Sequence, residues 1–283
     1  MAVTVELVGQ IIERIAPKWW AEDWDNVGLL VGDTAAPVER ILLTLDGTLE
    51  IASEAKEFDA QLIVAHHPIM FKPLKNLRAD NTAAQLPLLL WQHKIAYYAA
   101  HTNLDQSILS SSRALGDVLG LTDMKALAEP SEDRAYLPGQ DRLGYGVIGY
   151  LPKPEKLGVV WKEFISCLEQ LGACSLPENR SGARLAGDAE KMVRKVAIVN
   201  GSGTSFLSKA LFKGADLLIT GDVDHHTALE AMDIGVAIAD LGHFWSEAPM
   251  MHALYHYLTA EKQLHNVEIR VSAKNRSPWA DLE

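Results

Sequence analysis

The sequence predicts an α/β fold made of two similar halves. Short apolar segments alternate with longer helical segments, a pattern typical of β-α-β units in which helices cover both faces of a sheet. The order of these segments over residues 41–67 recurs over residues 196–226. Each half also contains a histidine followed four positions later by a carboxylate. We therefore predict an internal duplication whose halves are related by a pseudo-twofold axis.

The first half begins with a predicted amphipathic helix over residues 4–16. Its apolar side chains recur at helical spacing, Thr4 can cap its start and Pro17 ends it. Strand and helix patterns then alternate along the chain. The predicted strands are residues 29–31, 41–45, 61–65 and 95–100, and the predicted helices are residues 48–57 and 82–93.

The second half repeats this alternation. Residues 129–142 and 175–192 are rich in proline, glycine and charge, so we predict that they form surface connections. The predicted strands are residues 146–151, 196–199, 216–220 and 236–240, and the helices are 155–171 and 204–212. We place the N-terminal half at residues 1–126, the second half at 127–260, and a C-terminal segment that packs back on the first half at 261–283.

Composition narrows the class of protein. The 283 residues suffice for one large domain or two ordinary ones, and the net charge of -11 argues against nucleic acid as a partner. The chain shows neither a signal-peptide pattern nor an apolar run of the ~20 residues that span a bilayer. We expect a cytoplasmic protein without a membrane partner. Cys167 and Cys174 are too few for a disulfide framework, and we expect ordinary, at least half-buried thiols.

Four clusters of polar residues follow predicted strands, where ligands bind in open α/β sheets. Imidazoles and carboxylates without thiolates suit an open site for zinc, iron, manganese or nickel. The donors outnumber the needs of one ion, so we expect two divalent metal ions, which favours hydrolysis by an activated water. The clusters are His66 with His67, His101 with Asp105, Asp222 with His225 and His226, and His243 with Glu247.

Simpler explanations remain open for several of these residues. Adjacent side chains of a regular strand point to opposite faces, so His66 and His67 share a site only if the backbone leaves the pleat, which Pro68 makes plausible. His243 and Glu247 alone would be an ordinary pair on a helix face. The Gly201–Gly203 turn before a helix could bind an anion or simply connect strand to helix. We interpret His93, His252, His256 and His265 as ordinary core or surface residues.

Five motifs together resemble the dinuclear-metal family of GTP cyclohydrolase 1 type 2 homologues, over about residues 5–280. They are WDNVGLLVG from Trp24 to Gly32, AHHP from Ala65 to Pro68, HTNLD from His101 to Asp105, Thr220-Gly-Asp222 with His226, and Gly242-His243 with Ser246-Glu247. The resemblance implies two intertwined α/β halves with mixed sheets covered by helices. It also implies a ring-shaped homohexamer built from dimers.

The same resemblance implies roles for individual residues. His66, His67, Asp105, His243 and Glu247 match the metal ligands, with Glu247 as the bridge. Residues His101 and His226 match positions near the metals and are expected to transfer protons or act as occasional ligands. The function expected is hydrolysis of a small phosphorylated or nucleotide-like substrate. Two alternatives are a metal-responsive interaction or regulatory protein, and nucleic-acid handling, which the acidic composition disfavours.

Overall fold

The computed structural model describes residues 2–130, 144–170 and 183–279. The chain forms two compact units. In the described parts, the first unit contains residues 2–107 and 251–276, and the second contains 108–130, 144–170, 183–250 and 277–279. In the described residues the chain thus passes between units after Ser107, after Met250 and after Arg276, whereas the sequence analysis placed its boundaries at residues 126 and 260.

The first unit is built on a five-stranded mixed sheet in the order β1-β4-β3-β2-β11. Neighbouring strands are parallel except β1, which runs antiparallel to β4 at one edge. Strand β11, from the C-terminal part of the chain, pairs with β2 at the other edge. The strands are β1 (Gly28–Val31), β2 (Arg40–Thr44), β3 (Leu62–Ala65), β4 (Ala96–Ala99) and β11 (Glu268–Val271).

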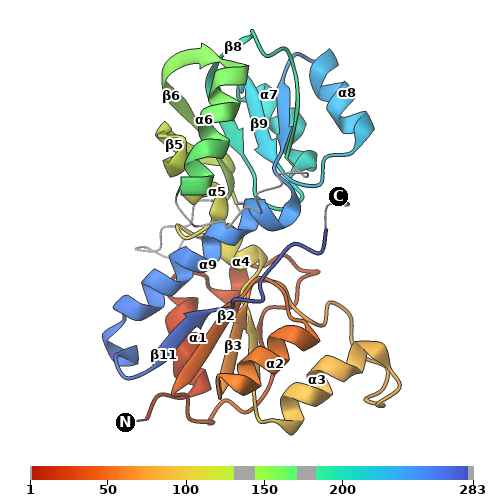
Figure 1. Ribbon diagram of the computed structural model, residues 1–283, viewed down its shortest axis with the longest axis vertical. Helices are drawn as coiled ribbons and strands as arrows, with labels where there is room; N and C mark the ends of the chain where they lie inside the picture. Colours follow the sequence, from red (N-terminus) through yellow and green to blue (C-terminus); the bar gives the residue numbers. More distant parts are fainter. Residues whose placement is uncertain (1, 131–143, 171–182, 280–283) are drawn as a thin grey trace. The chain divides into compact units, whose positions relative to one another are not determined.

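Helices cover both faces of this sheet. Helices α2 (Leu49–Glu57) and α3 (Thr82–Gln92) lie on one face (Figure 1), where their apolar side chains pack against Ile63 and Tyr97. Helix α1 (Val5–Glu13) lies on the other face, close enough that a Cβ on Gly9 would come within 3.0 Å of the Tyr98 ring. Alternate residues of β4 therefore pack against different helices, as the pleat requires.

The starts of these helices follow from the sequence. Thr4 caps α1 by accepting a hydrogen bond from the Leu7 N–H at 3.3 Å. Thr48 caps α2 in the same way, accepting from the Ile51 N–H at 3.2 Å. Both threonines hold an extended backbone and satisfy one of the N–H groups that a helix N-terminus leaves open. The predicted capping of α1 by Thr4 is confirmed.

The second unit contains a six-stranded mixed sheet in the order β5-β6-β8-β9-β10-β7. Its central strands β8, β9 and β10 are parallel, and the other strands run antiparallel to their neighbours. The strands are β5 (Thr122–Ala128), β6 (Tyr145–Lys156), β7 (Arg184–Ala186), β8 (Met192–Ile198), β9 (Leu217–Thr220) and β10 (Ala237–Asp240). The predicted α/β class with mixed, helix-covered sheets is confirmed.

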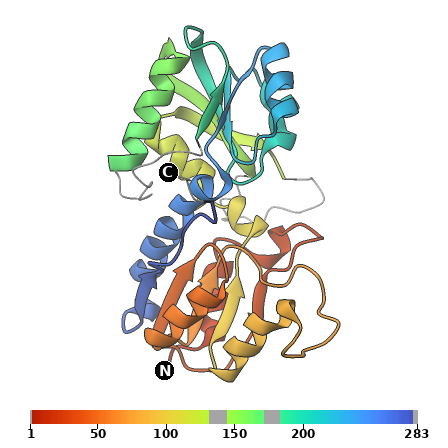
Figure 2. The same ribbon diagram turned by 45° about the vertical axis from the view of Figure 1, so that its right-hand side comes forward.

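In the described part of the chain, helices cover both faces of the second sheet. Leu115 of α5 and Phe164 of α6 pack on one face, and Ala210 of α7 and Ala231 of α8 pack on the other. Figure 2 shows α6 in green and α8 in blue on opposite sides of the strands. The helices are α5 (Ser111–Val118), α6 (Leu157–Gln170), α7 (Leu207–Phe212), α8 (His225–Asp233) and the long α9 (His243–Ala260), which begins in this unit.

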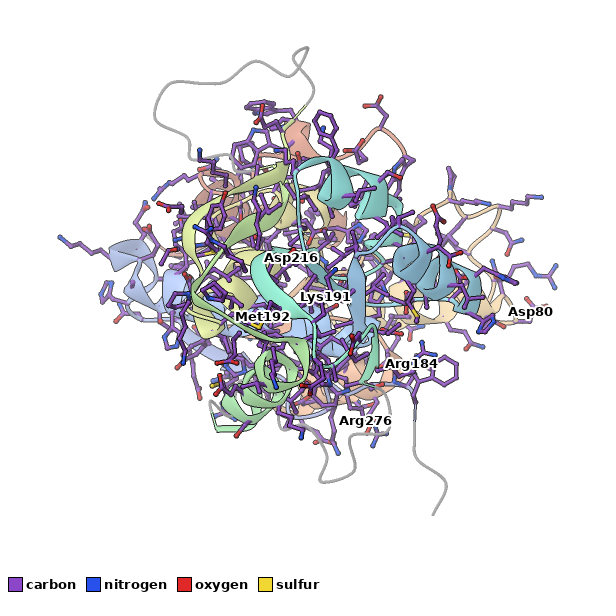
Figure 3. All side chains as sticks on the ribbon, turned by 90° about the horizontal axis from the view of Figure 1, so that it is seen from above. Asp80, Arg184, Lys191, Met192, Asp216 and Arg276 are labelled. Carbon is purple, nitrogen blue, oxygen red and sulfur yellow. The ribbon has the colours of Figure 1, made fainter. Side chains whose placement is uncertain are left out.

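The two sheets share a strand order, since β1-β4-β3-β2 corresponds to β7-β10-β9-β8. The match extends to single hydrogen bonds at the start of β3 and β9. Gln61 accepts two backbone N–H groups at 2.9 Å, and Asp216, labelled in Figure 3, does the same. The donors are Glu39 and Arg40 in the first unit, and Arg194 and Lys195 in the second. This repetition supports the predicted internal duplication.

Several elements differ from the sequence interpretation. Strand β7 lies within residues 175–192, which we had predicted to be a surface connection. A three-residue strand is too short to display alternation, so the pattern could not reveal it. Cys167 was expected to be at least half-buried but is exposed on α6, and Cys174 lies outside the described residues. Among the described helices, none has the length and apolarity to cross a membrane.

The repeated hydrogen bonds predict matched losses of stability. Replacing Gln61 or Asp216 by alanine removes the oxygen atom that accepts two backbone N–H groups, so each change should lower the free energy of unfolding by about 1–2 kcal/mol. Urea denaturation measures this. Lys209→Ala, on the exposed side of α7, should change it by less than about 0.5 kcal/mol. If Gln61→Ala and Asp216→Ala lower the free energy of unfolding no more than Lys209→Ala does, these hydrogen bonds contribute little to stability.

Candidate metal centre

Three imidazoles meet at the ends of β3 and β4 in the first unit. One ring nitrogen from each of His66, His67 and His101 lies within 4.8 Å of the others, a group that could hold a metal ion. His66 is fully buried, and the other two rings are partly exposed. Their ring centroids lie 4.8 to 5.4 Å apart. The structure thus brings together residues that are up to 35 positions apart in the sequence.

Each of these rings is oriented by an oxygen atom that accepts a hydrogen bond from Nδ1. A carbonyl or carboxylate oxygen accepts only, so Nδ1 carries the hydrogen and Nε2 keeps its lone pair. Metal-binding histidines show this arrangement, because the acceptor fixes the ring and makes Nε2 more basic. The pairs are His66 with the Ala100 carbonyl at 2.9 Å, His67 with Asp46 at 2.8 Å, and His101 with Asp25 at 2.9 Å.

The backbone leaves the regular strand where His66 and His67 follow β3. Their consecutive N–H groups donate to Thr44 and Leu45, at 3.1 and 2.8 Å. Neighbouring N–H groups of a regular strand point to opposite sides, so two bonds to one neighbouring segment mark a departure from the pleat. The Tyr97 hydroxyl also donates to the His67 carbonyl at 2.8 Å. The expectation that both rings can reach one site is confirmed.

Asp25 is the most strongly bound of the supporting carboxylates. Its side chain is fully buried and accepts from Thr102 N–H and Oγ1, at 3.1 and 2.5 Å, besides His101. Burial raises the pKa of Asp25, but the hydrogen bonds from His101 and Thr102 outweigh burial and lower it to about 2. Asp25 is therefore ionised at neutral pH and faces His101 with a full negative charge.

Asp105 places a carboxylate group close to His66. It ends the short helix α4 (Thr102–Asp105), and its Oδ1 lies 3.7 Å from His66 Nε2. The segment is held in place by Asn103, which accepts from the His101 N–H at 2.9 Å and donates to the Ala16 carbonyl at 2.7 Å. The HTNLD motif thus supplies two chemically useful side chains and one residue that positions them.

The second unit presents a histidine and a carboxylate at the start of α9. His243 Nε2 lies 3.3 Å from Oε2 of the nearly buried Glu247, and Asp222 holds His243 Nδ1 at 2.7 Å. The hydrogen bond with Glu247 raises the pKa of His243 to about 9, against the lowering effect of burial and with help from Asp222. At neutral pH His243 therefore carries a proton on Nε2. A metal ion bound at Nε2 would displace this proton and release it to solvent.

Gly201 leaves the space that Glu247 occupies. Its backbone has φ +63°, and a Cβ there would come within 2.4 Å of Glu247 Oε1. The Gly201 and Gly203 N–H groups donate at 2.8 Å to the hydroxyls of Ser246 and Thr220. Both amides therefore have hydrogen-bond partners within the protein. Of the two roles considered for the Gly201–Gly203 turn, this favours a connection between strand and helix over an anion-binding site.

The Ser111 side chain forms hydrogen bonds with backbone groups of α9 near Glu247. Pro249, inside α9, lacks an N–H group and interrupts the helical hydrogen bonds. The Ser111 hydroxyl donates to the Glu247 carbonyl at 2.6 Å and accepts from the Met250 N–H at 2.9 Å. The carboxylate of Glu247 therefore projects from a turn that is fixed from outside the helix.

The two His-His pairs do not occupy corresponding places, contrary to the sequence interpretation. The Ala65 carbonyl accepts from Ala100, and the Thr220 carbonyl accepts correspondingly from Leu241. The residues after Thr220 are Gly221 and Asp222, so these correspond to His66 and His67. Residues His225 and His226 lie further on, exposed in the first turn of α8, where their rings are 5.4 Å apart.

The parallel between His101–Asp105 and His243–Glu247 is also shifted by one residue. The His101 carbonyl accepts from the Asp105 N–H, and the Gly242 carbonyl accepts in the same way from Ser246. His101 therefore corresponds to Gly242. The shared spacing in the sequence reflects similar chemistry at neighbouring, not identical, positions of the repeat.

The fold and these side chains define an α/β protein with histidine and carboxylate groups suited to metal binding. The chain belongs to the Duf34/NIF3 (NGG1p interacting factor 3) family, whose model matches residues 3–278. It is 34% identical over 269 residues to a Clostridium perfringens protein named GTP cyclohydrolase 1 type 2 homolog, covering 95% of this chain and 96% of that one. A Clostridium acetobutylicum protein of the same name is 31% identical, with 99% of each chain covered.

A solved structure supports the same relationship. The crystal structure of a hypothetical protein from Staphylococcus aureus matches with a TM-score of 0.85 and 27% identity, covering 100% of both chains. This solved structure shares the fold of the chain, and the resemblance to the GTP cyclohydrolase 1 type 2 homologues is confirmed.

Asp46 should matter for metal affinity through His67. Removing it as Asp46→Ala frees the His67 ring to rotate and lowers its basicity, so metal affinity should fall about 10- to 100-fold. Competition with a chromogenic chelator measures the affinity. Asp117→Ala removes an exposed carboxylate that pairs with Arg113 on α5 and serves as the control. Equal affinities of the two variants would contradict the role of Asp46.

Gly201→Ala and Gly214→Ala form a matched pair. Both glycines have positive φ, so each change should cost about 1–2 kcal/mol of stability. Only at Gly201 would the new Cβ collide with Glu247, since nothing lies within 4 Å of a Cβ at Gly214. Metal content, measured by elemental analysis of folded protein, should fall in Gly201→Ala alone. Equal metal content in both variants would contradict the close approach of Glu247.

Proposed function

We propose that the chain is a cytoplasmic, dinuclear metal-dependent hydrolase of a small phosphorylated or nucleotide-like substrate. The observation that carries the proposal is the hydrogen-bonding pattern shared by His66, His67, His101 and His243. In each ring Nδ1 is held by an oxygen atom, so Nε2 is the nitrogen that would bind a metal. Histidines with a purely structural role do not need to share one hydrogen-bonding pattern at Nδ1.

The proposed ligands come from both units. We propose that His66, His67 and Asp105, together with His243 and Glu247, would hold the two ions. Neutral imidazole and carboxylate donors suit zinc, iron, manganese or nickel, and cellular supply selects among them. Such ions supply Lewis acidity and lower the pKa of water, which makes hydrolysis possible at neutral pH.

The remaining polar residues move or hold protons. His101 transfers a proton at Nε2 while ionised Asp25 holds the hydrogen on Nδ1, so the charge that His101 gains is matched by a nearby carboxylate. His101 is also close enough to His66 and His67 to act as a ligand. His226, exposed on α8, is proposed as a second proton-transfer residue.

Turnover by metal-loaded protein tests this function. A panel of phosphoesters, nucleotides and cyclic amides should contain a substrate whose hydrolysis stops on chelation and returns when metal is restored. Glu247→Ala should lose both metal and turnover. His101→Ala and His226→Ala should retain metal and lose at least about tenfold in rate. Loss of metal from His101→Ala would make His101 a ligand, and absence of any turnover across the panel would contradict the proposal.

A second candidate function is a metal-responsive interaction or regulatory protein. It is favoured by the description of the matching family, which names an interacting factor. A chelator added during affinity purification should then release a defined partner, and metal should restore it. A hydrolase would show no such exchange. Light scattering on the same samples tests the proposed hexamer, which would have six times the chain mass of 31.1 kDa.

A further inference from the structure

We propose that Trp24 and Phe71 form a stacking surface for the heteroaromatic base of a nucleotide substrate, beside His101. This inference rests on the proposed function and narrows its substrate class. It assigns a binding role to two side chains that contribute neither to the core nor to the metal-ligand set. Both residues belong to the first unit.

The two rings meet each other and the same imidazole. The Trp24 and Phe71 centroids are 6.5 Å apart with an angle of 32° between the ring planes. His101 lies edge-on to both, with centroid distances of 6.0 Å to Trp24 and 5.7 Å to Phe71. A planar ligand bound on these rings would therefore lie next to the proposed proton-transfer residue.

Both rings remain in contact with solvent. Trp24 is 62% exposed and Phe71 is 49% exposed, although large aromatic side chains are normally well buried. One exposed aromatic residue is ordinary, but two that converge on a candidate metal-site histidine form a continuous apolar surface. Nucleobases stack on such surfaces with a gain of about 1–3 kcal/mol per base.

The surface is fixed by neighbouring residues. Asp25, next to Trp24, is fully buried and bonded to His101 and Thr102. Asn26 donates from Nδ2 to the carbonyl oxygen of Met70, the residue before Phe71, at 2.5 Å. This bond ties together the two segments that carry the rings. A preorganised surface loses less entropy on binding a ligand, which favours a binding role.

The charge around Phe71 favours a nucleotide over an uncharged aromatic ligand. Residues 69–79 contain three basic residues and no acidic residue, in a chain of net charge -11. Arg78 is paired with Asp80, which Figure 3 labels, but the exposed Lys72 directly follows Phe71 in the chain. Lys72 thus offers a solvent-exposed cation for a phosphate in the same segment as Phe71.

Binding of ligands with and without a base tests the inference on metal-loaded protein. Calorimetry with ATP, GTP, ribose 5-phosphate and inorganic triphosphate should show at least about tenfold tighter binding of the nucleotides. Trp24→Ala and Phe71→Ala should each reduce that preference about tenfold while leaving base-free ligands and metal content unchanged. Trp24→Phe should retain most of the preference. Lys72→Ala should weaken all four ligands.

Trp91→Ala is the matched control, because Trp91 is 64% exposed on α3 in the same unit. It should leave every affinity unchanged. Equal binding of nucleotides and base-free phosphates by the unaltered protein would overturn the inference, as would an unchanged preference in Trp24→Ala. A change in oligomeric mass without a change in preference would instead make the rings a contact between copies, which also overturns it.

The test of the stacking surface and the test of hydrolysis can give different results. Turnover of base-free phosphates with no preference for nucleotides would leave the hydrolase proposal standing and remove the stacking role. Conversely, base-dependent binding without turnover of any nucleotide would support Trp24 and Phe71 as a binding surface and contradict hydrolysis.

Discussion

The orientation of four imidazoles by hydrogen bonds at Nδ1 is the constraint on which the candidate site depends. Without these acceptors, each ring could rotate or exchange its proton between nitrogens, and the nitrogen available to a metal would not be defined in any of them. The acceptors come from the loop before β1, the loops after β2 and β9, and the end of β4, so the strand order of each sheet determines which ring finds a partner. The fold and the metal chemistry are therefore linked through Asp25, Asp46, Asp222 and the Ala100 carbonyl.

Much of the fold could be predicted because apolar periodicity is a local property. The strands around Leu62 and Leu217 and the helix capped by Thr48 each show their pattern within a few residues. Strand β7 shows no such local pattern, because its backbone is held in a strand by pairing with β10 rather than by a pattern in its own sequence. The stretch containing α5 and β5 was left unassigned, since small polar residues such as Ser111 and Ser112 obscure a helix that is largely buried.

For the candidate site, the sequence indicated the clusters but not their supports. His66 and His67 were recognisable because they are adjacent at a strand end. Asp25 and Asp46 were missed as partners, because they lie 76 and 21 positions from the histidines that they hold. The comparison of the two halves by residue type also failed at His225, because His225 and His226 belong to the first turn of α8, whereas His66 and His67 directly follow β3. Backbone hydrogen bonds reveal the correct correspondence where side-chain identity does not.

The mismatch between the two repeats has an evolutionary consequence. Where one copy places His66, His67 and His101, the other has Gly221, Asp222 and Gly242, so descent from a common ancestor has left the copies with different donor atoms. The first copy offers three imidazoles and the Asp105 carboxylate, and the second offers His243 and Glu247 from an adjoining helix. A gene encoding either copy alone would therefore carry an incomplete set of donors, and duplication would have been the step that allowed such specialisation.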